Sequence, residues 1–144
     1  MERNDIENAS KYLKQSYSIN PKNTDIAYKL AKLYYNQKKY NLAKEILEDI
    51  WNNPNNADTI NLLGLCYMKL KDYKRAELVF GKLIEAFPKN HMVMGYLAQC
   101  CFELKEYDKA QNWALKALEI FSDWDDAIKI LKKIKEKREQ KDEQ

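Results

Sequence analysis

Apolar residues recur at helical spacing in two stretches in the middle of the chain, residues 57–70 and 73–86. The apolar positions are Leu63, Cys66, Tyr67 and Leu70 in the first stretch and Ala76, Val79, Phe80, Leu83 and Ile84 in the second. Steps of three and four residues put each set on one side of a helix. Polar Lys71 and Asp72 interrupt the pattern between the stretches, and Pro88 cannot continue a helix. The pattern therefore predicts two amphipathic helices joined by a short turn.

The same pattern returns along the chain at intervals of 33 and 34 residues. The positions that show both intervals are Pro21, Pro54 and Pro88; Tyr40, Tyr73 and Tyr107; Ala43, Ala76 and Ala110; and Ala31, Gly64 and Ala98. A period near 34 residues is typical of stacked pairs of helices. Two of these positions hold only small residues, and helices can approach closely where neither presents a bulky side chain. We therefore expect the two helices of each pair to cross at these small residues.

The repeats divide the chain into five parts. Three helical pairs are expected at residues 24–56, 57–90 and 91–124; a half-repeat with only the second helix at 1–23; and a capping helix with a frayed tail at 125–144. The apolar side of the capping helix is predicted to consist of Ala127, Ile128, Leu131 and Ile134. Its other sides carry lysines, as expected for a helix that ends a stack. Residues 136–144 are all charged or Gln, and we expect them to fray.

The second pair carries a motif that points to a known family. Its residues are Leu63, Gly64, Tyr67, Ala76, Phe80 and Pro88, in the pattern L-G-x-x-Y…A-x-x-x-F…P. This pattern resembles the tetratricopeptide repeat, and the resemblance covers about residues 5–135. The resemblance implies an all-α fold, a right-handed superhelical stack of antiparallel helix hairpins (a tetratricopeptide solenoid). Lys38, Lys71 and Lys105 stand in the turns where such repeats often place glycine.

Composition indicates a helical domain without catalytic machinery. Three glycines and three prolines are too few for a fold rich in tight turns, and no glycine-rich nucleotide-binding motif is present. The one histidine, His91, is expected at the solvated start of a helix, without cysteines or carboxylates clustered around it. The three cysteines lack C-x-x-C spacing and are expected in the core. We therefore expect no enzymatic activity, no cofactor and no metal.

Charge and hydropathy indicate where the protein is expected to be located and which classes of partner it is expected to bind. No apolar run approaches the roughly 18 residues of a membrane span, and the first residues lack the apolar stretch of a signal peptide. Cysteines without a disulfide pattern are typical of a reducing compartment, so a cytoplasmic location is expected. The net charge is only +3, and acidic residues interrupt the lysines. We therefore expect no nucleic acid partner.

The first helix of each pair supplies the candidate partner-binding site. In a stack of hairpins these helices line the concave side. The side chains that helical spacing directs into this groove are Asp25, Tyr28, Lys32, Tyr35, Asp58, Asn61, Leu65, Met68, Met92, Gln99 and Phe102. Aromatic and methionine side chains suit an extended peptide or an amphipathic helix of another protein. The expected function is that of a protein–protein interaction module.

The resemblance also narrows the kind of peptide that is expected. Family members that clamp the C-terminal carboxylate of cytosolic heat-shock chaperones use Lys, Asn and Arg at set groove positions. The matching residues here are Tyr28, Lys32, Leu62, Met92 and Tyr96. Only Lys32 fits such a role, so a carboxylate clamp of that type is not expected.

The N-terminal half-repeat leaves alternatives open. Its apolar residues include Ile6, Leu13 and Tyr17, and the flank that a preceding helix would cover is expected to be exposed. The chain is then a fragment of a longer array, or its first helix reorients, or a second copy covers that flank. The last case predicts a self-assembling structural scaffold. Another alternative function is a secretion-type chaperone that holds hydrophobic segments in the groove.

Overall fold

The computed structural model describes residues 3–52 and 56–142. The helices are α1 (Arg3–Ile19), α2 (Thr24–Asn36), α3 (Tyr40–Ile50), α4 (Ala57–Lys69), α5 (Tyr73–Ala86), α6 (His91–Glu103), α7 (Tyr107–Ile120) and α8 (Asp125–Asp142). Within these two ranges the chain contains no strand. The prediction of an all-α fold is confirmed. Pro54, one of the periodic prolines, lies outside the described residues.

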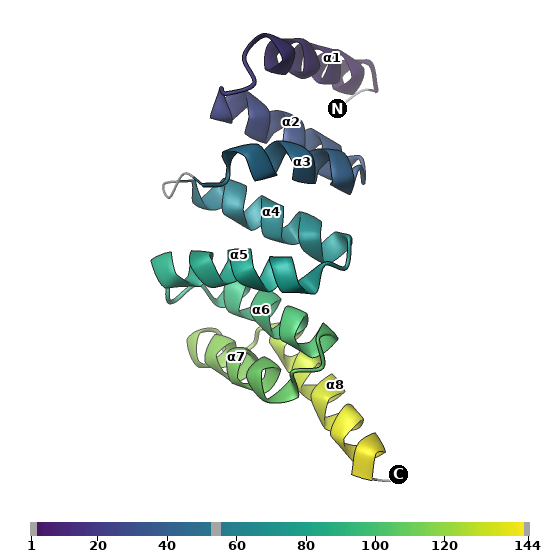
Figure 1. Ribbon diagram of the computed structural model, residues 1–144. Coiled ribbons are helices and arrows are strands. Elements are labelled where there is room, and N and C mark those ends of the chain that lie inside the picture. The colour runs from purple at the N-terminus through teal and green to yellow at the C-terminus, as the bar shows by residue number, and fades with distance from the viewer. Residues whose placement is uncertain (1–2, 53–55, 143–144) are drawn as a thin grey trace. The chain divides into compact units, whose positions relative to one another are not determined.

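The helices form two compact units, residues 1–71 with α1 to α4 and residues 72–144 with α5 to α8. Within each unit, every helix packs on the helix that follows it along the chain (Figure 1). In addition, α2 contacts α4 in the first unit and α6 contacts α8 in the second. Each unit therefore brings alternate helices together as well as consecutive ones.

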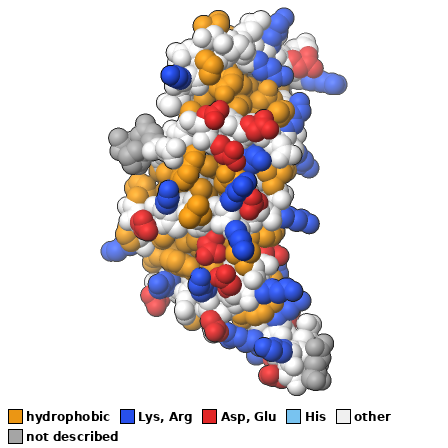
Figure 2. Space-filling model, in the orientation of Figure 1, with side chains coloured by type: hydrophobic (Ala, Val, Ile, Leu, Met, Phe, Trp, Pro, Cys, Tyr) orange, Lys and Arg blue, Asp and Glu red, His pale blue; other side chains and the backbone are white. Residues whose placement is uncertain are grey.

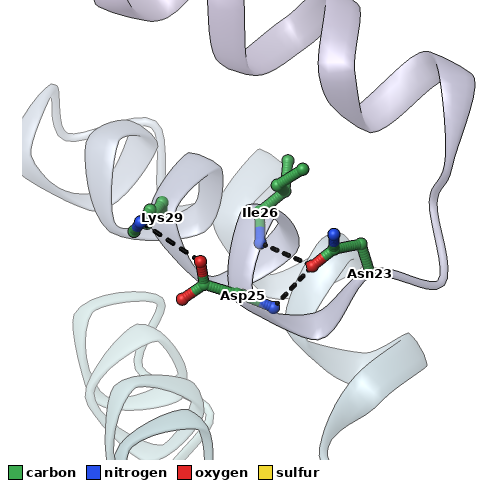
Figure 3. A network of polar contacts seen from close by, with 4 residues as sticks. All are labelled: Asn23, Asp25, Ile26 and Lys29. Carbon is green, nitrogen blue, oxygen red and sulfur yellow. Dashed lines mark hydrogen bonds and ion pairs between the residues drawn. The ribbon is translucent and has the colours of Figure 1, made fainter.

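Asparagine side chains begin three of the helices. The Asn23 side chain accepts hydrogen bonds from the backbone N–H groups of Asp25 and Ile26 at 3.1 and 3.3 Å (Figure 3). Asn56 and Asn90 each accept one from the backbone N–H three residues further on, at 3.2 and 3.3 Å. Caps of this kind contribute about 1 kcal/mol each. They recur with the repeat and set the starts of α2, α4 and α6.

A lysine in the left-handed conformation follows each of these three helices. Lys38, Lys71 and Lys105 have φ angles of 63°, 62° and 64°. This conformation costs an L-residue about 1–2 kcal/mol, because its Cβ approaches the following carbonyl oxygen. The turns therefore keep the backbone geometry that glycine would adopt without this cost.

Small residues lie on the packed sides of the helices in both units. In the first unit, Ala31 of α2 and Ala43 of α3 are fully buried. In the second, Ala98 of α6 and Ala110 of α7 are also fully buried. These alanines occupy the positions where the repeat pattern predicts that paired helices cross.

The buried side of α8 differs from its prediction. Ile128 is 45% exposed, whereas Ile130 is buried together with Ala127 and Ile134. The reason is that α8 packs against both α6 and α7, so the side that meets these two helices runs through Ile130. The sequence pattern located the apolar helix and three residues of its packed side, Ala127, Leu131 and Ile134, correctly; it was wrong for Ile128.

The last turns of α8 also differ from the expectation that the chain frays from residue 136, because the helix continues to Asp142. The Arg138 guanidinium donates a hydrogen bond to Gln111 at 3.0 Å and pairs with the Asp108 carboxylate at 2.6 Å. Both partners lie on α7. These contacts hold the end of α8 against α7, which the charged sequence of this segment does not reveal.

Candidate functional site

In the first unit, the predicted groove residues lie on α2 and α4, and none of them is buried. Exposed are Asp25, Lys32 and Asp58; partly buried are Tyr28, Tyr35, Asn61, Leu65 and Met68. By contrast, Leu30 and Leu63, on other sides of the same helices, are 2% and 0% exposed. The outward sides of α2 and α4 thus carry partly accessible apolar side chains beside polar ones.

Tyr28 of α2 and Asp58 of α4 influence one another electrostatically. Burial, with the Asp58 carboxylate as a second cause, raises the pKa of Tyr28. Asp25 is engaged within its own helix, because Lys29 pairs with it at 3.1 Å (Figure 3). The candidate surface of the first unit therefore combines a tyrosine with nearby negative charge, while the charge of Asp25 is already paired.

In the second unit, the predicted residues lie on α6. Met92 is 44% exposed, while Gln99 and Phe102 are partly buried. The Gln99 amide donates a hydrogen bond to Glu103 at 2.9 Å. The Phe102 ring lies 6.0 Å from the Lys133 ammonium of α8. The α6 surface thus continues onto α8, a neighbour that the sequence analysis did not assign to the groove.

Of the matched carboxylate-clamp positions, Leu62 is buried at 6% exposure. Tyr96 is partly buried, and burial together with the Asp126 carboxylate raises its pKa. An acidic side chain beside Tyr96 disfavours a bound carboxylate there. Lys32 remains exposed on α2.

The residues proposed for an oligomer face lie on α1 in different environments. Ile6 is 36% exposed, whereas Leu13 and Tyr17 are partly buried. Burial, with the Asp49 carboxylate of α3 as a second cause, raises the pKa of Tyr17. The most exposed apolar side chains of α1 are Tyr12 at 67% and Ile19 at 85%.

His91 is not the solvated residue that the sequence analysis expects. Its ring stacks on Phe121 with centroids 5.3 Å apart and meets the edge of Trp124 at 4.9 Å. Phe121 and Trp124 come about one repeat later in the sequence, between α7 and α8. A single histidine between aromatic rings has no acid or metal ligand beside it in this cluster, so packing explains its position.

All three cysteines, Cys66, Cys100 and Cys101, are buried and carry free thiols, as expected. Burial raises the pKa of each thiol to about 12. The thiolate is the form that attacks electrophiles and binds metals. At neutral pH these thiols are therefore protonated members of the core.

One cluster of polar side chains was not predicted from the sequence. Glu77 of α5, Cys101 of α6 and Glu106 before α7 place one sulfur and two carboxylate oxygens within 4.8 Å of one another. Lys109 Nζ lies 3.2 Å from Glu106 and 4.0 Å from Glu77. The Lys109 ammonium balances the negative charge of Glu77 and Glu106, as a metal ion would. The raised pKa of Cys101 keeps its thiol protonated. The arrangement is that of an ion-pair cluster, and its members are too far apart in sequence to be found by spacing.

No helix within residues 3–52 and 56–142 combines the length and the apolar character needed to cross a bilayer.

The structure resembles several solved structures. A crystal structure of MamA matches with a TM-score of 0.78 and 21% identity, over 99% of this chain and 94% of that one. The first tetratricopeptide domain of human RPAP3 matches with a TM-score of 0.74 and 18% identity, over 86% and 98%. The first tetratricopeptide domain of Spaghetti (RPAP3), bound to the HSP90 peptide SRMEEVD, matches with a TM-score of 0.72 and 19% identity, over 77% and 89%. At these identities the similarity is one of fold.

Two family profiles match the sequence itself. One, described as "Anaphase-promoting complex, cyclosome, subunit 3", matches residues 2–83, and the other, described as "Tetratricopeptide repeat", matches residues 67–134. Both describe tetratricopeptide repeat families. No curated protein sequence matches the chain. With its helical pairs, its repeat motif and these two profiles in agreement, the chain belongs to the tetratricopeptide repeat family.

Proposed function

We propose that this chain is a protein-interaction module that binds a peptide or an amphipathic helix of a partner on the outward sides of α2 and α4 in the first unit, and that the outward side of α6 offers a similar surface in the second unit. The observation that carries the proposal is the exposure pattern. None of the predicted groove residues is buried, although they are interleaved with the most buried residues of the same helices. Accessible apolar side chains grouped in this way mark interaction surfaces.

The chemistry of the surface suits a partner with apolar side chains. Tyr28, Leu65 and Met68 offer aromatic and flexible aliphatic contacts, and methionine adapts its shape to different partners. Lys32 and Asn61 lie among them and would fix the register of a bound segment by hydrogen bonds. The first tetratricopeptide domain of Spaghetti (RPAP3), which shares this fold, is bound to a peptide in its structure. This supports peptide binding as the use of the fold here.

The test is selection of peptides from a random displayed library on the full chain. Selected peptides should bind a Tyr28→Ala, Met68→Ala and Met92→Ala variant at least about tenfold more weakly, because burial of such side chains contributes about 1–2 kcal/mol each. The matched control replaces Tyr12, Leu42 and Leu78 by alanine; these side chains are 67%, 43% and 61% exposed on α1, α3 and α5. Equal loss of binding in both variants would show that the groove residues are not the site.

The same selection distinguishes the chaperone alternative. A module for one partner should return peptides that share a sequence motif. A chaperone for hydrophobic segments should return peptides that share only apolar composition, with similar affinities. The self-assembly alternative depends on α1 and is tested separately below.

A further inference from the structure

A second surface lies in the unit formed by α5 to α8, and none of its lining residues belongs to the predicted groove. A cavity of about 500 Å³ opens between the turn that follows α6, the first turn of α7 and the last turns of α8. Its cationic lining residues are Lys105, Lys109, Lys137, Arg138 and Lys141. We call this the basic cavity. Figure 2 shows Lys and Arg side chains close together near the C-terminal end of this unit.

The charges of the basic cavity do not cancel. Its two acidic lining residues are already paired, Glu106 with Lys109 at 3.2 Å and Asp108 with Arg138 at 2.6 Å. Lys105, Lys137 and Lys141 have no acidic partner within the described part of the chain. Five cations and two anions leave a charge of +3 around the cavity.

The fold positions the backbone segments that carry the three remaining lysines. Arg138 fixes α8 on α7 through Asp108 and Gln111. Lys137 and Lys141 are four residues apart on the same helix, so they lie on one side of it. Lys105 projects from the turn, where its backbone has a φ of 64°. Like charges that line one cavity repel one another, and a bound anion relieves this repulsion.

We propose that the basic cavity binds a short acidic segment of a partner protein, with aspartate or glutamate carboxylates placed between Lys105, Lys137 and Lys141. The volume admits a few side chains only. A nucleic acid needs a longer basic track along its backbone, and here acidic side chains alternate with basic ones over the surface seen in Figure 2. The proposal does not depend on the groove, because the basic cavity shares no residue with it.

The experiment is a titration of the full chain with fluorescein-labelled hexaglutamate at low ionic strength. Replacing Lys105, Lys137 and Lys141 by Gln should weaken binding about tenfold, since exposed ion pairs have small but cumulative effects. The matched control replaces Lys11, Lys22 and Lys69 by Gln. It removes the same charge from exposed positions elsewhere, and its affinity should stay within about twofold of wild type.

Further measurements make the outcome decisive. Circular dichroism should show unchanged helicity in both variants, and Lys141→Gln alone, in the last turn of α8, should weaken binding about two- to threefold. The proposal is overturned if hexaglutamate does not bind, or if both triple variants lose affinity equally. It is also overturned if oligothymidylate of equal charge binds more tightly than hexaglutamate, because the cavity would then be a nucleic acid site.

Discussion

Three lysines adopt a left-handed backbone conformation that is unfavourable for any residue other than glycine, and this conformation recurs in each repeat. Lys38, Lys71 and Lys105 have the positive φ that glycine adopts freely, and each stands between two helices that must reverse direction. The side chain gives no compensating buried contact, because Lys38, Lys71 and Lys105 are all exposed. The turn geometry is therefore imposed by the packing of the helices on either side.

Glycine at these turns should stabilise the protein. We expect Lys38→Gly and Lys71→Gly each to raise the free energy of unfolding by about 0.5–1 kcal/mol, because relief of the left-handed conformation outweighs the added freedom of the unfolded chain. Urea unfolding followed by circular dichroism measures the change. The control is Lys11→Gly, in the middle of α1, which should lower stability by about 1 kcal/mol. Destabilisation by the turn variants would contradict the strain assigned to these lysines.

The buried thiols predict a decline of stability in alkaline solution. Burial raises the pKa of Cys66, Cys100 and Cys101 to about 12 in the folded chain, from an ordinary value of 9.0. Their contribution is fully present below pH 9 and is lost as the pH rises toward 12, because the unfolded chain releases the thiol protons first. Urea midpoints between pH 8 and about pH 11 should fall, and they should fall less in Cys66→Ala. A flat wild-type profile would exclude this cause.

At the scale of elements, side-chain contacts between helices determine where each helix lies. Trp124, between α7 and α8, lies close against α6, because a Cβ added at Gly95 of α6 would lie 2.9 Å from Trp124 Nε1. A Cβ added at Gly81, on α5, would meet nothing within 4 Å. The two glycines share a helical setting and differ only in what faces them.

This contrast predicts that replacing each glycine by alanine has opposite effects on the stability of the protein. Gly81→Ala should stabilise the protein by about 1 kcal/mol, the difference in helix propensity. Gly95→Ala should destabilise it by about 1 kcal/mol, because displacement of Trp124 costs more than the propensity gains. Thermal unfolding of both variants, with tryptophan fluorescence as a second probe, makes the comparison. Equal stabilisation of both variants would mean that Trp124 does not restrict α6.

The end of α8 depends on one arginine. Arg138→Ala should lower stability by about 1 kcal/mol, a value reduced by the 96% exposure of the Asp108 side chain. It should also speed amide hydrogen exchange after residue 134, because the last turns lose their contacts with α7. The control is Arg3→Ala, whose ion pair with Glu7 is 92% and 65% exposed and should have no measurable effect. Unchanged hydrogen exchange in α8 would show that its last turns are stable without the contacts of Arg138.

At the scale of the whole molecule, the main question is whether α1 associates with a second copy. Tyr12 and Ile19 are seven residues apart and lie on the same side of α1, whereas Ile6 lies on another side. Leu13 and Tyr17 are partly buried already. The exposed apolar area is therefore divided between two sides of the helix, which weakens the case for a scaffold.

We accordingly expect a monomer in light scattering over a wide range of concentrations. Ile6→Asp together with Ile19→Asp should leave the measured mass unchanged and stability nearly so, because both side chains are exposed. Oligomers in the wild type that dissociate in this double variant would support the scaffold alternative. Leu42→Asp together with Leu78→Asp, exposed positions on α3 and α5, is the matched control for the two added charges.

The sequence by itself determined the helices, their turns and most of their buried sides, because helical periodicity, asparagine caps and the recurrence of small residues act over a few neighbouring positions. It also predicted candidate groove residues on α2, α4 and α6, none of which is buried. Only the tertiary structure decided that Ile130 instead of Ile128 is buried on α8, the aromatic contacts of His91 and the joining of Arg138 to Asp108 across 30 residues. These depend on which distant helices meet, and no local pattern carries that information. The basic cavity has the same origin, since lysines from a turn and from α8 become neighbours only when the helices pack.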